Sequence, residues 1–309
     1  RAPGERRMGV RVQLGLEYLD QVLGQPDPWC CFVSLQEPHD PFVCGTRALA
    51  GYDVDAVELS PSVHDDLAGR PGIYRKAARV WAHMTDRQRR EAAACYYASI
   101  TEIDQQMGRL IDRVAAAGQL DRTVVVFTAD HGELLGAHGL YCKNFSGAEE
   151  IYHVPLVMAG PGVAAGAVSD ARVGLHDLCP TLLELAGCPT IDAPDSRSFT
   201  PVLRQPAATA GWQWGYAEYF GARLHLSQRV IWDGDWKLIF NGFDEDELYD
   251  RASDPWEMEN RIADPACADR VRRMCGILWE RCRATGDRTL LNSQYPILRV
   301  APFGPGISG

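Results

Sequence analysis

The sequence has no apolar run that approaches the roughly 18 residues needed to cross a bilayer, so it predicts no membrane span. It also has no excess of positive charge, because 31 lysines and arginines face 41 aspartates and glutamates, for a formal net charge of −10. No basic stripe offsets this balance, which argues against a nucleic-acid partner. At 309 residues and 46% hydrophobic content, the chain is long enough for one large globular domain with a small appendage.

The ten cysteines include no CxxC pair, which argues against a structural zinc site. Cys30 and Cys31 lie in an apolar run, and Cys95, Cys179 and Cys275 lie in helical patterns. We interpret the cysteines as buried free thiols that pack as small apolar residues. Such thiols favour a reducing compartment and therefore a cytoplasmic location.

A short apolar run at 123–127 ends in a polar group that contains Asp130 and His131. The run has the character of a strand that is buried on both faces, and ligands bind at the carboxyl ends of strands in open α/β sheets. A divalent cation could use both side chains there, and Lys143 further along suggests a site for an oxyanion. The alternative is that Asp130 caps a following helix and that His131 and Lys143 are ordinary surface residues.

Strand-like and helix-like segments alternate over the first 189 residues. The strands are expected at 29–35, 123–128 and 154–158, and the helices at 85–118, opened by a Thr85–Gln88 capping box, and at 177–186, capped by Asp177. This alternation predicts an α/β fold with a mostly parallel central sheet and helices on both faces.

The pattern changes after residue 189. Residues 190–210 are rich in Pro, Ala and Asp, a β-hairpin is expected at 229–240, and a terminal helix at 261–284. The predicted organisation is therefore a main domain at 1–189, a connector at 190–210, a small C-terminal α+β subdomain at 211–295 and a tail at 296–309.

Four collinear groups of motifs resemble the sulfatase family of the alkaline-phosphatase superfamily. They are FVSL and PHDPF at 32–35 and 38–42; TADHGE, HG and Lys143 within 128–143; VPL and DLCPTLL at 154–156 and 177–183; and WKL, ELYD and DPWEMEN at 236–238, 247–250 and 254–260. A lone DHG would be weak evidence, whereas four ordered groups over most of the chain are specific.

The resemblance implies that Asp130 and His131 are metal ligands, most often for Ca²⁺ in this family, with Mn²⁺, Mg²⁺ or Zn²⁺ as alternatives. It implies further that Lys143 binds a sulfate oxygen and that His39 lies beside the sulfate or the leaving oxygen, which gives both residues catalytic roles. His138 matches a histidine of many relatives and is a candidate substrate-binding residue. The implied substrate is a small-molecule or saccharide sulfate ester.

The sequence departs from the family at the nucleophile. Relatives carry a cysteine in a CxPSR motif that is converted to formylglycine, and no cysteine here is followed by x-Pro-Ser-Arg or x-Ala-Ser-Arg. We therefore expect an N-terminally truncated member whose nucleophile lies upstream, and no sulfate-ester hydrolysis by this chain alone. Two alternatives are a phosphodiesterase or phosphonate monoester hydrolase of the same superfamily, and a non-catalytic fragment.

Overall fold

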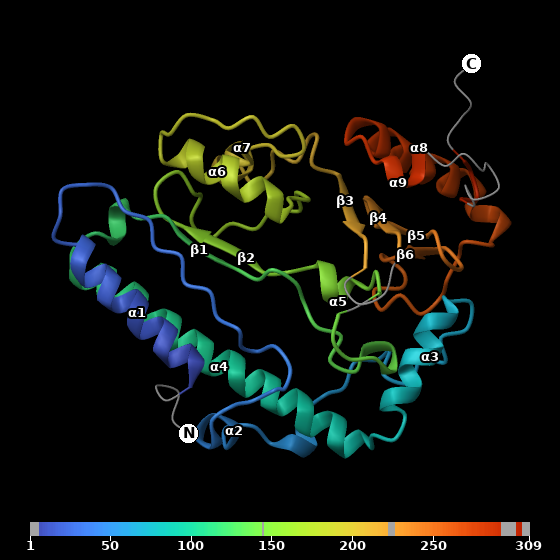
Figure 1. Ribbon diagram of the computed structural model, residues 1–309, viewed down its shortest axis with the longest axis horizontal. Coiled ribbons are helices and arrows are strands. Elements are labelled where there is room, and N and C mark those ends of the chain that lie inside the picture. Colours follow the sequence, from blue (N-terminus) through green and yellow to red (C-terminus); the bar gives the residue numbers. More distant parts are fainter. Residues whose placement is uncertain (1–5, 144, 222–225, 292–300, 305–309) are drawn as a thin grey trace. The chain divides into compact units, whose positions relative to one another are not determined.

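The computed structural model describes residues 6–143, 145–221, 226–291 and 301–304 (Figure 1). The chain divides into two compact units that interleave along the sequence. Unit 1 comprises Arg1–Ser60, His83–Phe127 and Leu156–Pro161, and unit 2 comprises Pro61–Ala82, Thr128–Pro155 and Gly162–Gly309. The domain boundaries predicted from the sequence stay a prediction, and parts of the predicted tail lie outside the described residues.

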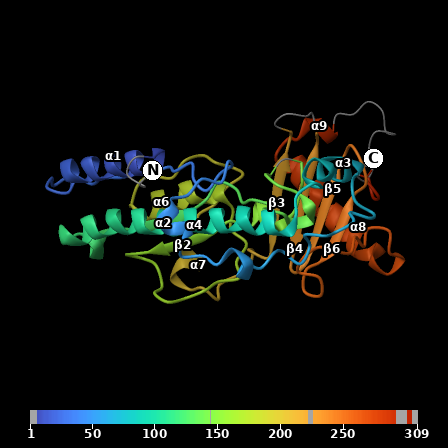
Figure 2. The same ribbon diagram turned by 90° about the horizontal axis from the view of Figure 1, so that it is seen from below.

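Two long helices dominate unit 1 and lie side by side in both views (Figures 1 and 2). They are α1 (Arg7–Val22) and α4 (Asp86–Ala116). Leu19 of α1 packs against Val114 of α4 because both belong to apolar stripes at helical spacing. The predicted capping box at Thr85 is present. The shorter elements are α2 (Thr46–Leu49), η2 (Val54–Ala56) and η3 (Leu120–Arg122).

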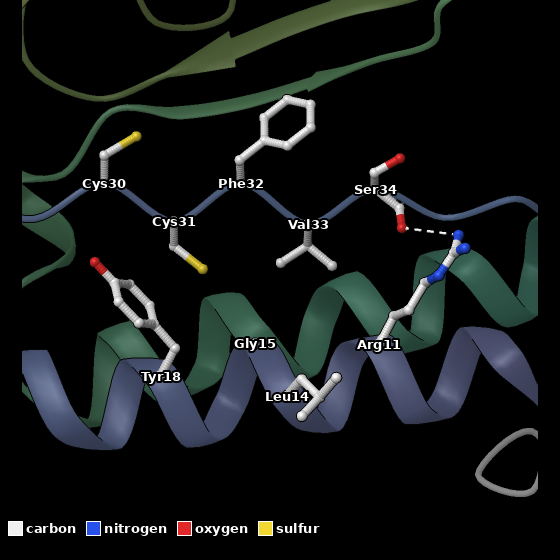
Figure 3. A pocket seen from close by; sticks show the side chains of 9 residues that line it. All are labelled: Arg11, Leu14, Gly15, Tyr18, Cys30, Cys31, Phe32, Val33 and Ser34. Carbon is white, nitrogen blue, oxygen red and sulfur yellow. Dashed lines mark hydrogen bonds between the residues drawn. The ribbon is translucent and has the colours of Figure 1, made fainter.

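The predicted strand at 29–35 has the side-chain pattern of a strand but no partner among the described residues. Figure 3 shows that Cys31 and Val33 point toward α1, whereas Phe32 points away, and the side chain of Phe32 is 90% exposed. Val33 approaches closely because α1 has Gly15 at that point, where an added Cβ would lie 3.0 Å from Val33 Cγ2. Residues of this segment and of α1 together line a groove of about 570 Å³, and none of the predicted site residues lines it.

The predicted strands at 123–128 and 154–158 are confirmed as β1 (Val125–Thr128) and β2 (Leu156–Ala159), which pair in a two-stranded sheet. The predicted burial of the first strand on both faces is wrong, since Phe127 is 39% exposed, and Val157 of β2 is 62% exposed. The described residues leave one side of each strand uncovered, and an apolar sequence alone cannot show which neighbours are present to cover it.

Unit 2 is built on a four-stranded antiparallel sheet in the order β3-β4-β5-β6 (Figure 2). Its strands are β3 (Trp214–Tyr219), β4 (Gln228–Asp233), β5 (Trp236–Asn241) and β6 (Glu247–Asp250). The hairpin between β4 and β5 confirms the prediction, and Gly234 supplies the positive φ of 60° at its turn.

Both faces of this sheet are covered, which explains why the whole of β4 is buried. Ile231 and Leu238 pack on one face against α8 (Ala268–Ala284), and Val230 and Ile239 belong to the cluster on the other. The predicted helix at 261–284 is shorter than expected because Asp264 caps a separate turn, η6 (Pro265–Cys267), before α8 begins.

The other elements of unit 2 are short. They are α3 (Gly72–Trp81), η4 (Ala137–Gly139), α5 (Glu149–Tyr152), η5 (Leu175–Asp177), α6 (Leu178–Leu185), α7 (Thr200–Arg204) and α9 (Arg288–Leu291). The predicted helix at 177–186 is confirmed as α6, but Asp177 does not cap it with its side chain. Its two carboxylate oxygens accept hydrogen bonds from the backbone N–H groups of Gly174 and Arg197 instead. No helix in the described part of the chain combines the length and apolar character that a membrane crossing requires.

Asp246, in the turn between β5 and β6, makes stability depend on pH. Its burial, offset in part by the hydrogen bond from the Asn241 N–H and reinforced by Glu247, raises its pKa to about 7. The folded protein therefore holds this proton more tightly than the unfolded chain, whose aspartates titrate near 4, so this group lowers stability as pH rises from about 4 to 7.

We therefore predict that Asp246→Asn, which keeps an oxygen for the Asn241 N–H but cannot ionise, stabilises the protein by about 2 to 4 kcal/mol at pH 8. The gain should vanish near pH 4. Urea unfolding at both pH values measures it. The exposed Glu280→Gln on α8 removes the same charge and is the control. An equal gain at both pH values would contradict the prediction.

Candidate active site

The loop after β1 places the two predicted metal ligands next to each other. Asp130 Oδ1 accepts a hydrogen bond of 3.0 Å from the His131 N–H, and the Asp130 side chain is 90% exposed. His131 Nδ1 lies 2.8 Å from the carbonyl oxygen of Gly132. A carbonyl can only accept, so Nδ1 is the donor in this contact, and in the neutral ring the lone pair lies on Nε2. Nε2 lies 3.8 Å from Asp130 Oδ2.

This pair fits part of a cation site. Two donors that each lie about 2.3 Å from one ion are separated by about 3.3 Å at a right angle, so only a small adjustment would let Oδ2 and Nε2 share an ion. The described residues contain no group of three or more His, Cys, Asp or Glu that could hold a metal. Calcium takes six to eight ligands, so the pair supplies a minority of those required.

Gly132 fixes this loop against α5. Its N–H donates a 2.7 Å hydrogen bond to the Ile151 carbonyl. A Cβ added at Gly132 would lie 1.8 Å from the Glu150 carbonyl oxygen, so no other residue fits without moving backbone. The glycine of the DHG motif is therefore required by close backbone packing, a role that the motif alone does not reveal.

Glu133 closes the loop between the predicted metal ligands and Lys143. Its Oε1 accepts hydrogen bonds from the N–H groups of Leu135, at 3.2 Å, and Cys142, at 2.5 Å. The Cys142 carbonyl accepts in turn from the Leu134 N–H at 3.2 Å. These bonds hold Cys142 beside residues 133–135 at the start of the loop. Lys143, which is half-buried, is the next residue along the chain. Glu133 is a positioning residue that the sequence interpretation did not single out.

His138 lies inside unit 2, where 1% of it is exposed. Its Nδ1 is 2.8 Å from Asp65 Oδ2 and 3.2 Å from Arg70 Nη2. Burial raises the pKa of Asp65, but the hydrogen bond with His138 and the charge of Arg70 outweigh it, and the net pKa is lowered. The predicted substrate contact of His138 stays a prediction. In the structure His138 holds η4 to the 62–70 segment, through its ring Nδ1 and through its backbone N–H, which donates to Ser62 Oγ at 3.2 Å.

His39 belongs to unit 1, in the loop that follows the extended 30–34 segment. Its N–H donates to the Gln36 carbonyl at 3.0 Å, which closes a turn. Its Nδ1 lies 2.9 Å from both the carbonyl oxygen and the Oδ1 of Asp40. The ring is 35% exposed.

A buried ion-pair network holds α5 in place. Glu149, at the start of α5, accepts a 3.0 Å hydrogen bond from Trp232 Nε1 and lies 3.5 Å from Lys237 Nζ and 3.0 Å from Arg251 Nη1. Lys237 is fully buried and pairs at 2.5 Å with Glu257, which is also buried. The motifs WKL and DPWEMEN therefore supply partners to one network, which holds the backbone against which Gly132 packs.

The C-terminal motifs also fix turns. Asn260 Oδ1 accepts from the Leu248 N–H at 2.9 Å, and its Nδ2 donates to the carbonyls of Gly69 and Asp246. These residues do not cap the last helix, because α8 begins only at Ala268, after the separate turn that Asp264 caps.

Two family profiles match this chain. The profile described as Sulfatase matches residues 7–188, and the one described as N-sulphoglucosamine sulphohydrolase, C-terminal, matches residues 136–283. The uncharacterized sulfatase YidJ of Escherichia coli (strain K12) is 31% identical over 254 residues, which are 82% of this chain and 51% of that protein. The choline-sulfatase of Rhizobium meliloti (strain 1021) is 30% identical over 247 residues, 77% of this chain and 47% of that protein. The chain thus spans about half the length of these curated relatives.

Solved structures confirm the predicted α/β fold. The phosphonate monoester hydrolase from Silicibacter pomeroyi superposes with a TM-score of 0.80 at 25% identity, covering 92% of this chain and 61% of that one. A structure described as a complex with its substrate D-glucosamine-2-N,6-O-disulfate has a TM-score of 0.75 at 24% identity, covering 90% of this chain and 70% of that one.

Proposed function

Because this chain belongs to the sulfatase family, we propose that it forms part of a hydrolase that cleaves sulfuric esters. The observation that carries the proposal is the position of the matched span. Residues 7–188 contain all five candidate site residues in their family order, namely His39, Asp130, His131, His138 and Lys143.

In this proposal Asp130 Oδ2 and His131 Nε2 are two ligands of a divalent cation, with Ca²⁺ as the first candidate. The cation would neutralise negative charge on the sulfate oxygens. The exposure of Asp130 and the lone pair on His131 Nε2 support this assignment. Lys143 would hold a sulfate oxygen, and His39 would exchange a proton with the leaving oxygen. The formylglycine nucleophile is proposed to lie in a part of the protein that this chain does not include.

A sulfated amino sugar is the proposed substrate class. Three similarities support it. The second matched profile is named after an N-sulphoglucosamine sulphohydrolase, and one solved neighbour was determined with a glucosamine disulfate substrate. An N-acetylglucosamine-6-O-sulfatase of Bacteroides thetaiotaomicron is also 33% identical over 193 residues. Phosphonate monoester hydrolysis is the second candidate, because a hydrolase of that class superposes with a TM-score of 0.80. The reducing compartment expected from the cysteines remains a prediction.

We predict that the purified 309-residue chain does not hydrolyse sulfate esters, because it has no CxPSR nucleophile and because its described residues contain no group of three or more metal-ligating side chains beyond the proposed pair. Turnover of an aryl sulfate and an aryl phosphonate is measured with Ca²⁺, with Mn²⁺ and with a chelator. The complete natural protein, assayed in parallel, should prefer the sulfate. Metal-dependent turnover by the chain alone would refute the prediction, and dominant phosphonate turnover by the complete protein would refute the proposed function.

A further inference from the structure

The segment that follows the His39 loop is attached along helix α4 at two points. The ring of Phe42 packs edge-on against Tyr96, with 5.5 Å between ring centroids. The N–H of Gly45 donates a 3.1 Å hydrogen bond to Glu102 Oε2. Cys44 lies between these two anchors, so its backbone is held beside α4 whatever its own side chain does.

The same face of α4 carries a second cysteine. Cys95 precedes Tyr96 by one residue and Glu102 by seven, which is two helical turns, so Cys95 and Glu102 lie on one face. The Cys44 thiol is a hydrogen-bonding neighbour of Cys95. Both side chains are partly exposed and both are free thiols. Arg6 reinforces the arrangement, because it pairs with Glu102 and donates a 3.0 Å hydrogen bond to the Val43 carbonyl.

We propose that Cys44 and Cys95 form a reversible oxidation site that closes a disulfide between the end of the His39 loop and helix α4. The oxidant is a low-molecular-weight disulfide such as oxidised glutathione. The Cys95 thiolate attacks one sulfur of the oxidant and releases one glutathione thiolate. The Cys44 sulfur, after losing its proton to solvent, then attacks Cys95 Sγ in the mixed disulfide and releases the second. Two protein thiols are oxidised, and one external disulfide is reduced to two thiols.

The electrostatics of the site set the order of these steps. Burial, the neighbouring Cys95 and Glu102 raise the pKa of Cys44 to about 11, while Arg6 opposes them. Cys44 therefore keeps its proton at neutral pH and is the second sulfur to react. Its protonated state also makes the exchange slow at neutral pH, since the thiolate is the nucleophile.

The bond would join residues that are 51 positions apart and would begin five residues after His39. Since the loop on both sides is already packed on α4, the link preserves the observed backbone course while it limits excursions of the His39 loop. A cross-link of this length constrains the unfolded chain, so it should raise the melting temperature, by about 5 °C for a protein of this size. The inference does not depend on the proposed function.

The test uses the reduced 309-residue chain with oxidised glutathione, followed by alkylation of the remaining thiols and peptide mapping by mass spectrometry. We expect a Cys44–Cys95 peptide pair, lighter by two hydrogen atoms than the separate peptides, that forms at least tenfold faster than any other intramolecular link. Dithiothreitol should remove both the link and the gain in melting temperature.

Matched variants identify the sulfurs. Cys44→Ser and Cys95→Ser should each abolish the link and the thermal shift while circular dichroism shows the parent fold. Cys30→Ser, which removes an exposed thiol in the same unit, should change neither. A chain that accumulates glutathione adducts at Cys44 or Cys95 without the link, or that links either residue faster to another cysteine, would overturn the proposal.

Discussion

Replacing Gly132 with alanine is expected to destabilise the protein by about 3 kcal/mol and to displace the loop that carries Asp130 and His131. The new Cβ would lie 1.8 Å from the Glu150 carbonyl oxygen, and a backbone atom cannot rotate away as a side chain can. Relief requires the loop and α5 to separate, which breaks the 2.7 Å hydrogen bond from the Gly132 N–H to the Ile151 carbonyl.

Urea unfolding of the 309-residue chain measures this loss, with Gly276→Ala as the matched control. Gly276 is an exposed residue inside α8, and its added Cβ would meet no atom within 4 Å. Alanine there should stabilise the helix by about 0.5 to 1 kcal/mol, because it loses less backbone entropy than glycine. The proposed function predicts in addition that, in a longer form of the protein that carries the proposed nucleophile, Gly132→Ala lowers turnover about 100-fold, since a displacement of about 1 Å at a reacting group has that effect. An unfolding midpoint equal to that of the parent would disprove the packing argument.

Lys237→Met is expected to cost about 3 to 5 kcal/mol at pH 8, because it leaves buried carboxylates without their principal cation. Lys237 Nζ lies 2.5 Å from Glu257 Oε1 and 3.5 Å from Glu149 Oε2, and the lysine is fully buried. Arg251 still lies 3.0 Å from Glu149 Oε1 and 3.6 Å from Glu257 Oε1, so both carboxylates keep one cationic neighbour.

The cost should depend on pH with a definite sign. Burial already raises the pKa of Glu257, against the opposing effect of Lys237. Without the lysine this pKa rises further, so the folded variant takes up a proton that the unfolded chain releases near pH 4.3. The destabilisation is therefore smaller at pH 5 than at pH 8.

Urea unfolding of Lys237→Met at these two pH values distinguishes a lost charge pair from lost packing. The double variant Lys237→Met, Glu257→Gln should recover part of the stability at pH 8, because one uncompensated charge is gone. If the single variant lost the same stability at both pH values, and the double variant recovered none, the pairing would not be the source of the effect.

Short-range patterns predicted the parts of this molecule that short-range forces determine. Thr85 and Gln88 are three residues apart, and their capping box forms as expected. The Asp233-Gly234-Asp235 turn places the two flanking strands in register because the turn itself sets the pairing. The positions of Asp130, His131 and Lys143 in one loop after a strand were predicted in the same way.

Longer-range packing produced the differences. The segment at 29–35 has the alternation of a strand, but pairing depends on a neighbouring strand, and the described residues supply none. Apolar β1 was expected to be covered on both faces, yet coverage depends on elements distant in sequence. The burial of His138 beside Asp65 depends on a segment 73 residues away, so no local pattern could show it, and the predicted substrate contact of His138 stays a prediction.

The sequence by itself determined the family, the α/β class and the loop that carries the candidate ligands, because motifs, caps and hydrophobic periods are local properties of the chain. Only the tertiary structure decided why that loop has its conformation. Gly132 is required by the backbone of α5, and α5 is held by Glu149 and its pairing with Lys237, 88 residues further along. Charges so far apart in sequence meet only after folding. In the low-polarity interior each buried charge is then stable only while its partner of opposite charge is present. The motif thus identifies the DHG loop, and a C-terminal sheet that is distant in sequence holds the loop in its conformation.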